Sequence, residues 1–247
     1  MGPTSWGRYT DLRGVLLTLT RTLFLDAGGV LLHPNWERVA EALRRHRVAA
    51  EAKSLARAEA FAKRELDTPE RVRTSTDDSR GWLYFNLVLK HAGIALSEHT
   101  DAALAELREY HRHRNLWETV PSEVWPTLAR FREAGLRLAV VSNANGTLCA
   151  HMERLGLAGL FDVVLDSHDQ GVEKPDPRFF QLALERTGSL PETTLHVGDL
   201  YQIDIVGARA AGLRAALVDA AGLYPEADCP RFPSLGAVAT AILEGAL

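Results

Sequence analysis

The hydrophobic positions of this chain follow two periodicities, which divide it into segments of different structure. Near the N-terminus, a short run of β-branched and apolar residues at 22–25 predicts a strand that is buried on both faces. Asp26 follows this strand directly, and Gly28 and Gly29 then end it with a tight turn. From residue 36 to about 114 the apolar residues recur at helical spacing instead, which predicts a helical insertion after the first strand.

Beyond residue 122, short apolar runs alternate with helical segments, as is typical of a parallel sheet with helical crossovers. The predicted strands are 136–141, 163–165, 195–197 and 213–218, and the predicted helices are 122–134, 147–155, 177–187, 202–211 and 234–244. We therefore predict an α/β fold: a Rossmann-like doubly wound parallel sheet formed by 1–34 and 116–247, with an inserted all-helical domain at 35–115. Residues 1–20 are predicted to be either a loose terminus or an additional edge strand.

Composition and charge exclude several classes of partner. The chain has 247 residues, 46% of them hydrophobic, and a net charge of −4, which is typical of a soluble globular protein. Its basic clusters at 43–47 and 111–114 alternate with apolar residues at helical spacing, so we interpret them as solvated helix faces and expect no nucleic-acid partner. The apolar stretch at 15–32 is interrupted by Arg21 and Asp26, so we expect neither a signal peptide nor a membrane span.

The two cysteines indicate the cellular compartment of the protein. Cys149 and Cys229 provide neither a disulfide framework nor a metal-ligand spacing, which fits a reducing cytoplasm. We expect Cys149 to be an inert, buried thiol. The sequence leaves the oligomeric state open between a monomer and a homodimer.

Polar residues lie where several of the predicted strands end. Asp26, Ser142 and Asp199 each follow a strand, and Lys174 lies in the loop after another. Neighbouring parallel strands are about 4.8 Å apart, so the carboxylates of two adjacent strand ends can meet at one point. They repel each other unless a cation lies between them, which predicts a hard divalent ion with oxygen ligands, Mg²⁺. Asp204 would be either a further ligand or an acceptor for metal-bound water.

Four segments, in this order and spacing, resemble the motifs of the haloacid dehalogenase superfamily: LFLDAGG at 23–29, VVSN at 140–143, GVEKPDP at 171–177 and HVGDLYQID at 196–204. The helical insertion resembles the C1-type cap of the same superfamily. The resemblance implies a hydrolase in which Asp26 is the nucleophile and forms a covalent aspartyl intermediate. It also implies that Ser142, Asn143 and Lys174 bind the transferring group, and that Lys174 neutralises Asp26. The implied Mg²⁺ ligands are Asp26, the Gly28 carbonyl, Asp199 and Asp204.

Gly28 departs from the pattern of the family's phosphatases, which carry an aspartate at this position as general acid and base. A general acid typically contributes about 10² to 10⁴ in rate, so we expect slow hydrolysis of alkyl phosphates. The favoured interpretation is a Mg²⁺-dependent, phosphatase-like hydrolase that acts on a small phosphorylated metabolite with a good leaving group. The alternatives are a non-catalytic protein that binds a phosphorylated ligand or a protein partner, and a haloacid dehalogenase.

Several of these residues also have purely structural interpretations. Ser142 and Asn143 could be ordinary turn residues, and Asp204 could be an acidic residue favoured at a helix start. Asp176 is expected to cap the helix that begins at Pro177. Five aromatic or imidazole residues, in the insertion or just before it, are expected in the cap core rather than in contact with substrate: His33, Trp36, Trp82, Tyr84 and Phe85.

Overall fold

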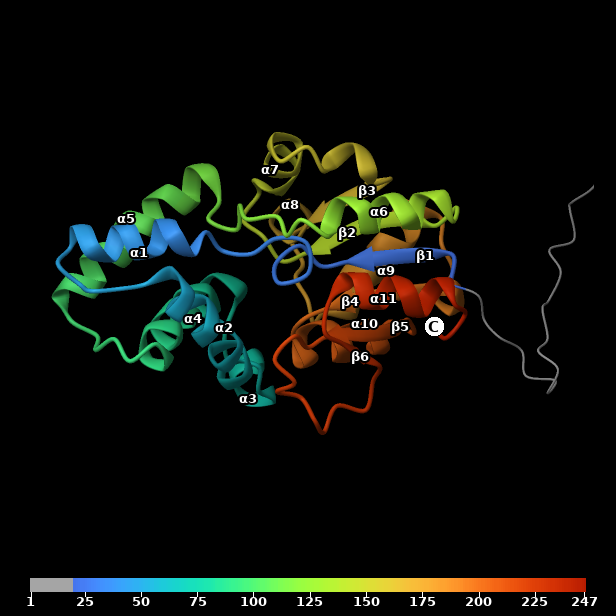
Figure 1. Ribbon diagram of the computed structural model, residues 1–247. Helices are drawn as coiled ribbons and strands as arrows, with labels where there is room; N and C mark the ends of the chain where they lie inside the picture. The colour runs from blue at the N-terminus through green and yellow to red at the C-terminus, as the bar shows by residue number, and fades with distance from the viewer. Residues whose placement is uncertain (1–19) are drawn as a thin grey trace, which may run out of the picture.

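A computed structural model describes residues 20–247, and Figure 1 shows a sheet-containing body beside a bundle of helices. The prediction for the N-terminal residues falls almost entirely on 1–19, which lie outside the described residues. The strands are β1 (Thr22–Leu25), β2 (Arg137–Ser142), β3 (Val163–Asp166), β4 (Thr194–Gly198), β5 (Arg214–Val218) and β6 (Arg231–Phe232). All of them pair in parallel, in the order β3-β2-β1-β4-β5-β6, which confirms the predicted α/β class.

The first strand lies at the centre of the sheet, where the chain reverses its direction of winding. Leu25 pairs with Val140 of β2 on one side and with Val197 of β4 on the other. The N–H of Asp26 then donates to the Val197 carbonyl at 2.9 Å. Ligands of open α/β sheets bind at such a reversal point, so Asp26 occupies the expected position for chemistry.

Helices cover both faces of the sheet, as the alternating pattern predicts. On one face lie α6 (Val124–Glu133), α7 (Leu148–Arg154) and α11 (Leu235–Leu243), and on the other lie α9 (Pro177–Thr187) and α10 (Val206–Ala210). Successive residues of β1 show the division, because Leu23 and Leu25 belong to the first apolar cluster whereas Phe24 belongs to the second. All three side chains are fully buried, which explains why these successive positions of the strand are all apolar.

The helical insertion has an apolar core of its own. Its helices are α1 (Trp36–Arg45), α2 (Ala52–Leu66), α3 (Pro69–Arg73), α4 (Asp77–His91) and α5 (Glu98–Arg114). The apolar residues that recur at helical spacing converge in this core, where Leu43, Phe85 and Leu107 are buried together. Thr76 and Ser97 begin α4 and α5 with capping boxes, which satisfy N–H groups that the first turn leaves unpaired. The exact boundaries at 35 and 115 stay a prediction. We call residues 36–114 the cap.

Three short elements were not predicted, because each lacks a visible periodicity. They are β6, α8 (Ser167–Gln170) and a π-helical turn, η3 (Tyr201–Ile205), which replaces the first half of the predicted helix at 202–211. The N–H groups of Tyr201 and Gln202 donate to the carboxylate of Asp67 from the cap, so the wide turn is satisfied by a distant residue. Two short 3₁₀ turns, Ala158–Leu160 and Pro191–Thr193, precede β3 and β4.

Two further findings concern the exposure of Cys149 and the length of the apolar helices. Cys149 is exposed, so the prediction of a buried thiol was wrong: in α7 the side chains of Leu148 and Met152 face the core, and Cys149 lies on the outer side. Within residues 20–247, no helix is both long enough and apolar enough to span a membrane.

Candidate active site

Three carboxylates converge at the carboxyl edge of the sheet. Asp26 follows β1, Asp199 follows β4, and Asp204 lies in η3, so two distant segments of the chain meet at this point. Each offers an oxygen that lies within 4.8 Å of the others, and all three residues are buried. The prediction that two strand ends would bring carboxylates together is thus confirmed by the pairing of β1 with β4.

Asp199 is the member of this cluster that is least compensated. Burial raises its pKa to about 7, although the ammonium of Lys63 lowers it, and the charges of Asp26 and Asp204 raise it further. Its Oδ2 atom lies 2.7 Å from Lys63 Nζ but accepts no hydrogen bond of acceptable geometry. A buried carboxylate oxygen with an open acceptor position, beside two further carboxylates, fits a hard divalent cation.

Lys174 binds two of the three carboxylates. Its Nζ atom lies 2.9 Å from Asp26 Oδ1 and 2.6 Å from Asp204 Oδ1. Burial alone would lower the pKa of Lys174, but the charges of Asp204 and Asp26 raise it overall. The lysine therefore remains an ammonium in a fully buried position, where it offsets the charge of Asp26.

Asp204 is saturated by its neighbours. Its Oδ1 atom accepts from Lys174 and lies 3.0 Å from His196 Nε2, and its Oδ2 atom accepts from the N–H groups of Asp199 and Leu200. Burial would raise its pKa, but Lys174 and His196 hold it well below the usual value. With its lone pairs engaged, Asp204 fits the predicted outer role better than that of a direct metal ligand.

Asn143 and Ser142 have different surroundings at the end of β2. The Asn143 amide donates to the Lys174 carbonyl at 3.0 Å and accepts from the Lys174 N–H at 2.7 Å, so it positions the lysine loop. The buried Ser142 hydroxyl makes one long hydrogen bond, 3.4 Å, to the Asn143 carbonyl. Its hydroxyl is thus weakly engaged and borders the pocket.

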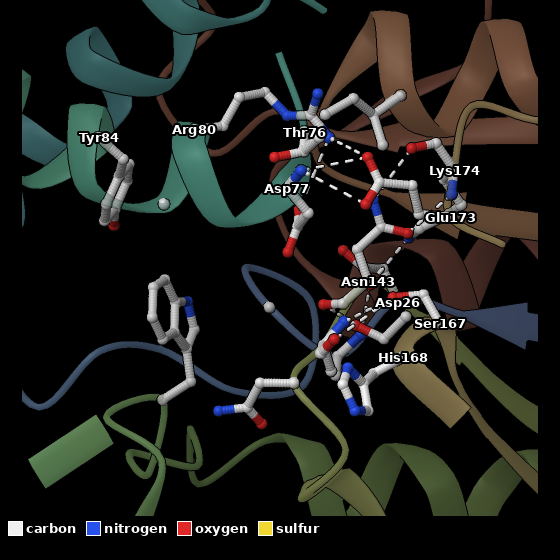
Figure 2. A pocket seen from close by; sticks show the side chains of 18 of the residues that line it. Asp26, Thr76, Asp77, Arg80, Tyr84, Asn143, Ser167, His168, Glu173 and Lys174 are labelled. Atoms are coloured by element: carbon white, nitrogen blue, oxygen red, sulfur yellow. Dashed lines mark hydrogen bonds and ion pairs between the residues drawn. The ribbon is translucent and has the colours of Figure 1, made fainter. Parts of the chain in front are cut away.

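A pocket of about 1070 Å³ extends from this cluster into the cap, and Figure 2 shows side chains of both parts around it. Trp36, Tyr84 and Phe85 lie in the cap core, in agreement with the prediction. Three of the aromatic side chains also line the pocket: Trp82, Tyr84 and Phe85. The same residues can therefore pack in the cap core and contact a ligand. The cap also lines it with five cationic or imidazole groups: Lys63, Arg80, Arg108, His111 and Arg112.

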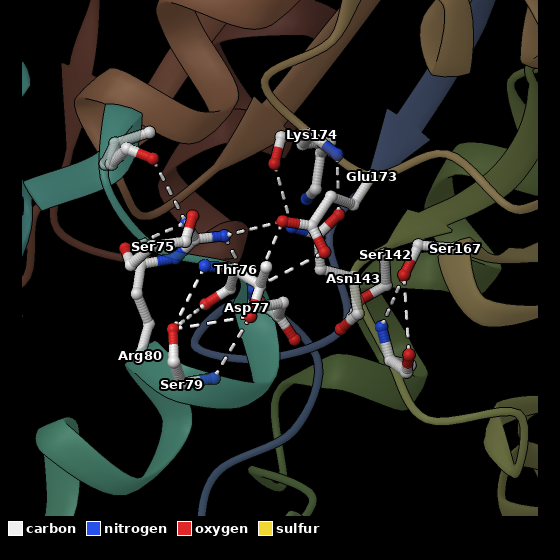
Figure 3. A network of polar contacts seen from close by, with 12 residues as sticks. Ser75, Thr76, Asp77, Ser79, Arg80, Ser142, Asn143, Ser167, Glu173 and Lys174 are labelled. Atoms are coloured by element: carbon white, nitrogen blue, oxygen red, sulfur yellow. Dashed lines mark hydrogen bonds and ion pairs between the residues drawn. The ribbon is translucent and has the colours of Figure 1, made fainter.

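Two groups of residues that contact the site were not predicted from the sequence. On α2, Lys63 lies 2.7 Å from both Asp199 and Glu59, and Glu59 is buried. The signal was a Glu–Lys pair four residues apart that includes one of only a few lysines. The second group consists of Asp77, Arg80 and Glu173, which connect the cap to the lysine loop (Figure 3).

The two glycines after Asp26 differ in what they tolerate. A Cβ atom at Gly28 would lie 3.3 Å from Trp117 Nε1, a contact that a small shift relieves. A Cβ atom at Gly29 would lie 2.0 Å from Asp199 Oδ2, and Gly29 has a φ of +77°. Gly29 is therefore required by the site, whereas Gly28 leaves room for a side chain.

Known proteins resemble this chain in sequence. The model of the haloacid dehalogenase-like hydrolase family matches residues 20–212. A phosphoserine phosphatase of Thermus thermophilus is 41% identical over 145 residues, which are 58% of this chain and 55% of the relative. The human haloacid dehalogenase-like hydrolase domain-containing protein 3 is 33% identical over 206 residues, 80% of this chain and 81% of the relative. The chain thus spans about half of the first relative and most of the second.

Solved structures share the fold over nearly the whole chain. A putative HAD hydrolase of Bacillus subtilis, YfnB, bound to magnesium, has a TM-score of 0.67 with 20% identity and covers 91% of this chain and 99% of its own. A 2-haloacid dehalogenase of Pseudomonas syringae has a TM-score of 0.57 with 26% identity and covers 93% and 100%.

Proposed function

Because the chain belongs to the haloacid dehalogenase-like hydrolase family, we propose that it is a Mg²⁺-dependent phosphatase-like enzyme that acts on a small phosphorylated metabolite. The observation that carries this proposal is the cluster of Asp26, Asp199 and Asp204 with the buried ammonium of Lys174. The names of the phosphatase relatives support a phosphoryl substrate. The free cysteines fit the proposed cytoplasmic location, and a monomer or homodimer is compatible with the site.

In the proposed reaction, Asp26 is the nucleophile. An anionic carboxylate attacks a phosphoryl group only if positive charge offsets their repulsion, and the ammonium of Lys174, 2.9 Å from Asp26, supplies it. Ser142 donates its hydroxyl to a phosphoryl oxygen, because that hydroxyl is only weakly engaged otherwise. Asn143 holds the backbone of Lys174 and thereby fixes the position of the ammonium.

The proposed metal position involves Asp26, the Gly28 carbonyl and Asp199, with Asp204 behind them. Bound there, Mg²⁺ would supply charge neutralisation to the phosphoryl group. The oxygen of Asp199 that accepts no hydrogen bond supports this assignment. The pairing of Lys63 with the same oxygen implies that the ammonium and the metal compete for it.

A phosphatase screen with and without Mg²⁺, across aryl, acyl and alkyl phosphates, tests the proposal. Turnover should require the metal and should disappear in Asp26→Asn, whose amide cannot form the phosphoryl ester. A beryllium fluoride adduct should form on the wild type and not on this variant. Turnover that persists in Asp26→Asn would place the chemistry elsewhere, and Mg²⁺ and phosphate binding without any turnover would select the non-catalytic alternative.

Haloacid dehalogenation is the second candidate function, because the Pseudomonas syringae enzyme is 26% identical over nearly the whole chain. That reaction attacks carbon and needs no metal, so it leaves the clustered carboxylates without a purpose. Chloride release from 2-chloropropionate in the presence of a chelator would favour this candidate over the phosphatase.

A further inference from the structure

The pocket contains a carboxylate that the proposed chemistry has not used. Among the described residues, four carboxylates line the pocket: Asp26, Asp77, Glu173 and Asp199. Asp26 and Asp199 are paired with lysines, and Glu173 accepts hydrogen bonds from the Asp77 N–H and from Arg80. Asp77 has the longest ionic contact of the four, because Arg80 Nη2 lies 3.8 Å from its Oδ1 atom.

The backbone of Asp77 is fixed, whereas its carboxyl group is paired with Arg80 only at long distance. Asp77 is the first residue of α4, directly after the capping residue Thr76, and its N–H donates to Glu173 Oε1 at 3.1 Å. Glu173 immediately precedes Lys174, so the cap residue is tethered to the loop that carries the catalytic lysine. The Asp77 side chain is 40% exposed, and Figure 2 shows its carboxyl group directed into the pocket.

We propose that Asp77 is the general acid and base of this enzyme and replaces the carboxylate that is missing at Gly28. This inference rests on the proposed phosphatase function. In an in-line displacement the leaving oxygen lies opposite the nucleophile, and Asp26 attacks from the core side. The leaving group therefore points toward the cap, where Asp77 lies.

The surroundings of Asp77 suit a proton donor. Partial burial between cap and core raises its pKa to about 6; Arg80 and the Asn143 amide lower it, while the charges of Glu173 and Asp26 raise it. Asp26 lines the pocket from the core and Asp77 lines it from the cap, so the space for the phosphoryl group is bordered by both carboxylates. An acid with a pKa near the working pH is efficient in both directions of proton transfer.

The proposed reaction consists of formation and hydrolysis of the aspartyl phosphate. An Asp26 oxygen forms a bond to phosphorus, the bond from phosphorus to the leaving oxygen breaks, and that oxygen takes its electron pair and the proton of Asp77. The products are the alcohol, the aspartyl phosphate and the Asp77 carboxylate. The carboxylate then removes a proton from water, whose oxygen attacks phosphorus and displaces Asp26. Phosphate leaves, and both aspartates return to their initial states.

Asp77→Asn tests the inference, because the amide keeps the size but cannot donate this proton. We expect kcat/KM for alkyl phosphates to fall by about 10² to 10⁴, with little change for aryl phosphates, whose leaving groups need no proton. In the wild type, alkyl phosphate hydrolysis should decline above pH 6 as Asp77 deprotonates, and this limb should be absent in the variant. Asp101→Asn, at an exposed position on α5, is the matched control and should be unchanged.

The outcomes separate this inference from the proposed function. An equal loss on aryl and alkyl phosphates, or an unchanged alkyl rate with an unchanged pH limb, would overturn the role of Asp77 while aryl turnover through Asp26 leaves the phosphatase function standing. A wild type that hydrolyses no phosphate and forms no beryllium fluoride adduct would overturn both. A thermal melt shows whether Asp77→Asn folds, and aryl turnover in the same sample shows whether its site is intact.

Discussion

The substitution Gly28→Asp tests which residue donates the proton to the leaving group. Gly28 lies two positions after Asp26, and its φ is not in the left-handed region, so an aspartate is compatible with the backbone. Its Cβ atom would lie 3.3 Å from Trp117 Nε1 and 3.5 Å from Trp117 Cδ1. The indole has to move by a few tenths of an ångström. Overpacking typically costs about 1 to 3 kcal/mol, and we expect a loss of unfolding free energy at the lower end of that range.

The expected gain depends on Asp77. In an Asp77→Asn background, Gly28→Asp supplies the only pocket carboxylate placed for proton transfer, so kcat/KM for alkyl phosphates should rise by about 10² to 10⁴. In the wild-type background Asp77 already donates, so the same substitution should add far less. Two groups that perform one task are not additive, and the difference between the backgrounds measures their redundancy. Gly28→Asn is the matched control, because it has the same bulk but no acid.

The assay compares kcat/KM for an alkyl and an aryl phosphate in all four combinations of wild type, Gly28→Asp and Asp77→Asn, at saturating Mg²⁺. Equal gains in both backgrounds would refute the reasoning, because they would mean that Asp77 delivers no proton. A gain with Gly28→Asn as large as with Gly28→Asp would attribute the effect to packing against Trp117. A thermal melt of each variant verifies that the folded protein is being compared.

Three further predictions concern charge and accessibility around the site. Asp199→Asn should weaken Mg²⁺ binding in calorimetric titration, and an unchanged affinity would contradict the metal assignment. Lys63→Met should tighten Mg²⁺ binding, because no ammonium then competes for the Asp199 oxygen. The same substitution leaves the buried Glu59 carboxylate without its ion pair, so the unfolding free energy measured by urea titration should fall by about 3 to 5 kcal/mol. Cys149 should react with a thiol reagent in the native protein, but slowly, because partial burial and nearby carboxylates raise its pKa. Cys229 is buried and should react only after unfolding. Reaction of both cysteines in the native protein would contradict the structure.

The core fold could be predicted because its signals are local. The β1 residues are β-branched or apolar at every position. Pro177 and Gly188 mark the start and end of α9, whose N-cap is Asp176 as predicted. The strand ends Asp26 and Asp199 met as expected, since parallel strands place their carboxyl ends at one edge. The π-helical turn could not be predicted, because its N–H groups are satisfied by Asp67, more than a hundred residues earlier in the sequence.

The part of the site that the sequence did not reveal comes from the cap. Lys63 and Asp77 lie on cap helices that carry many charged residues, and nothing in the sequence distinguishes these two from the others. They reach the site only because the cap docks on the core, where Lys63 contacts Asp199 and Asp77 contacts Glu173. The family motifs locate the core residues but contain no position for either. The exposure of Cys149 is a similar case, since its neighbour Leu148 is buried and the face of a short helix is not evident from one apolar pair.

Placing the proton donor on the cap makes catalysis depend on how the cap docks. In the family pattern, nucleophile and acid lie on one loop of the core, two residues apart. Here Asp26 is on the core and Asp77 on the cap, and the link between them passes through the bond from the Asp77 N–H to Glu173. Arg80 strengthens this link by donating to the same carboxylate at 3.2 Å. It follows that aspartyl phosphate formation from a good leaving group needs only the core, whereas hydrolysis of an alkyl phosphate needs the cap in its docked position.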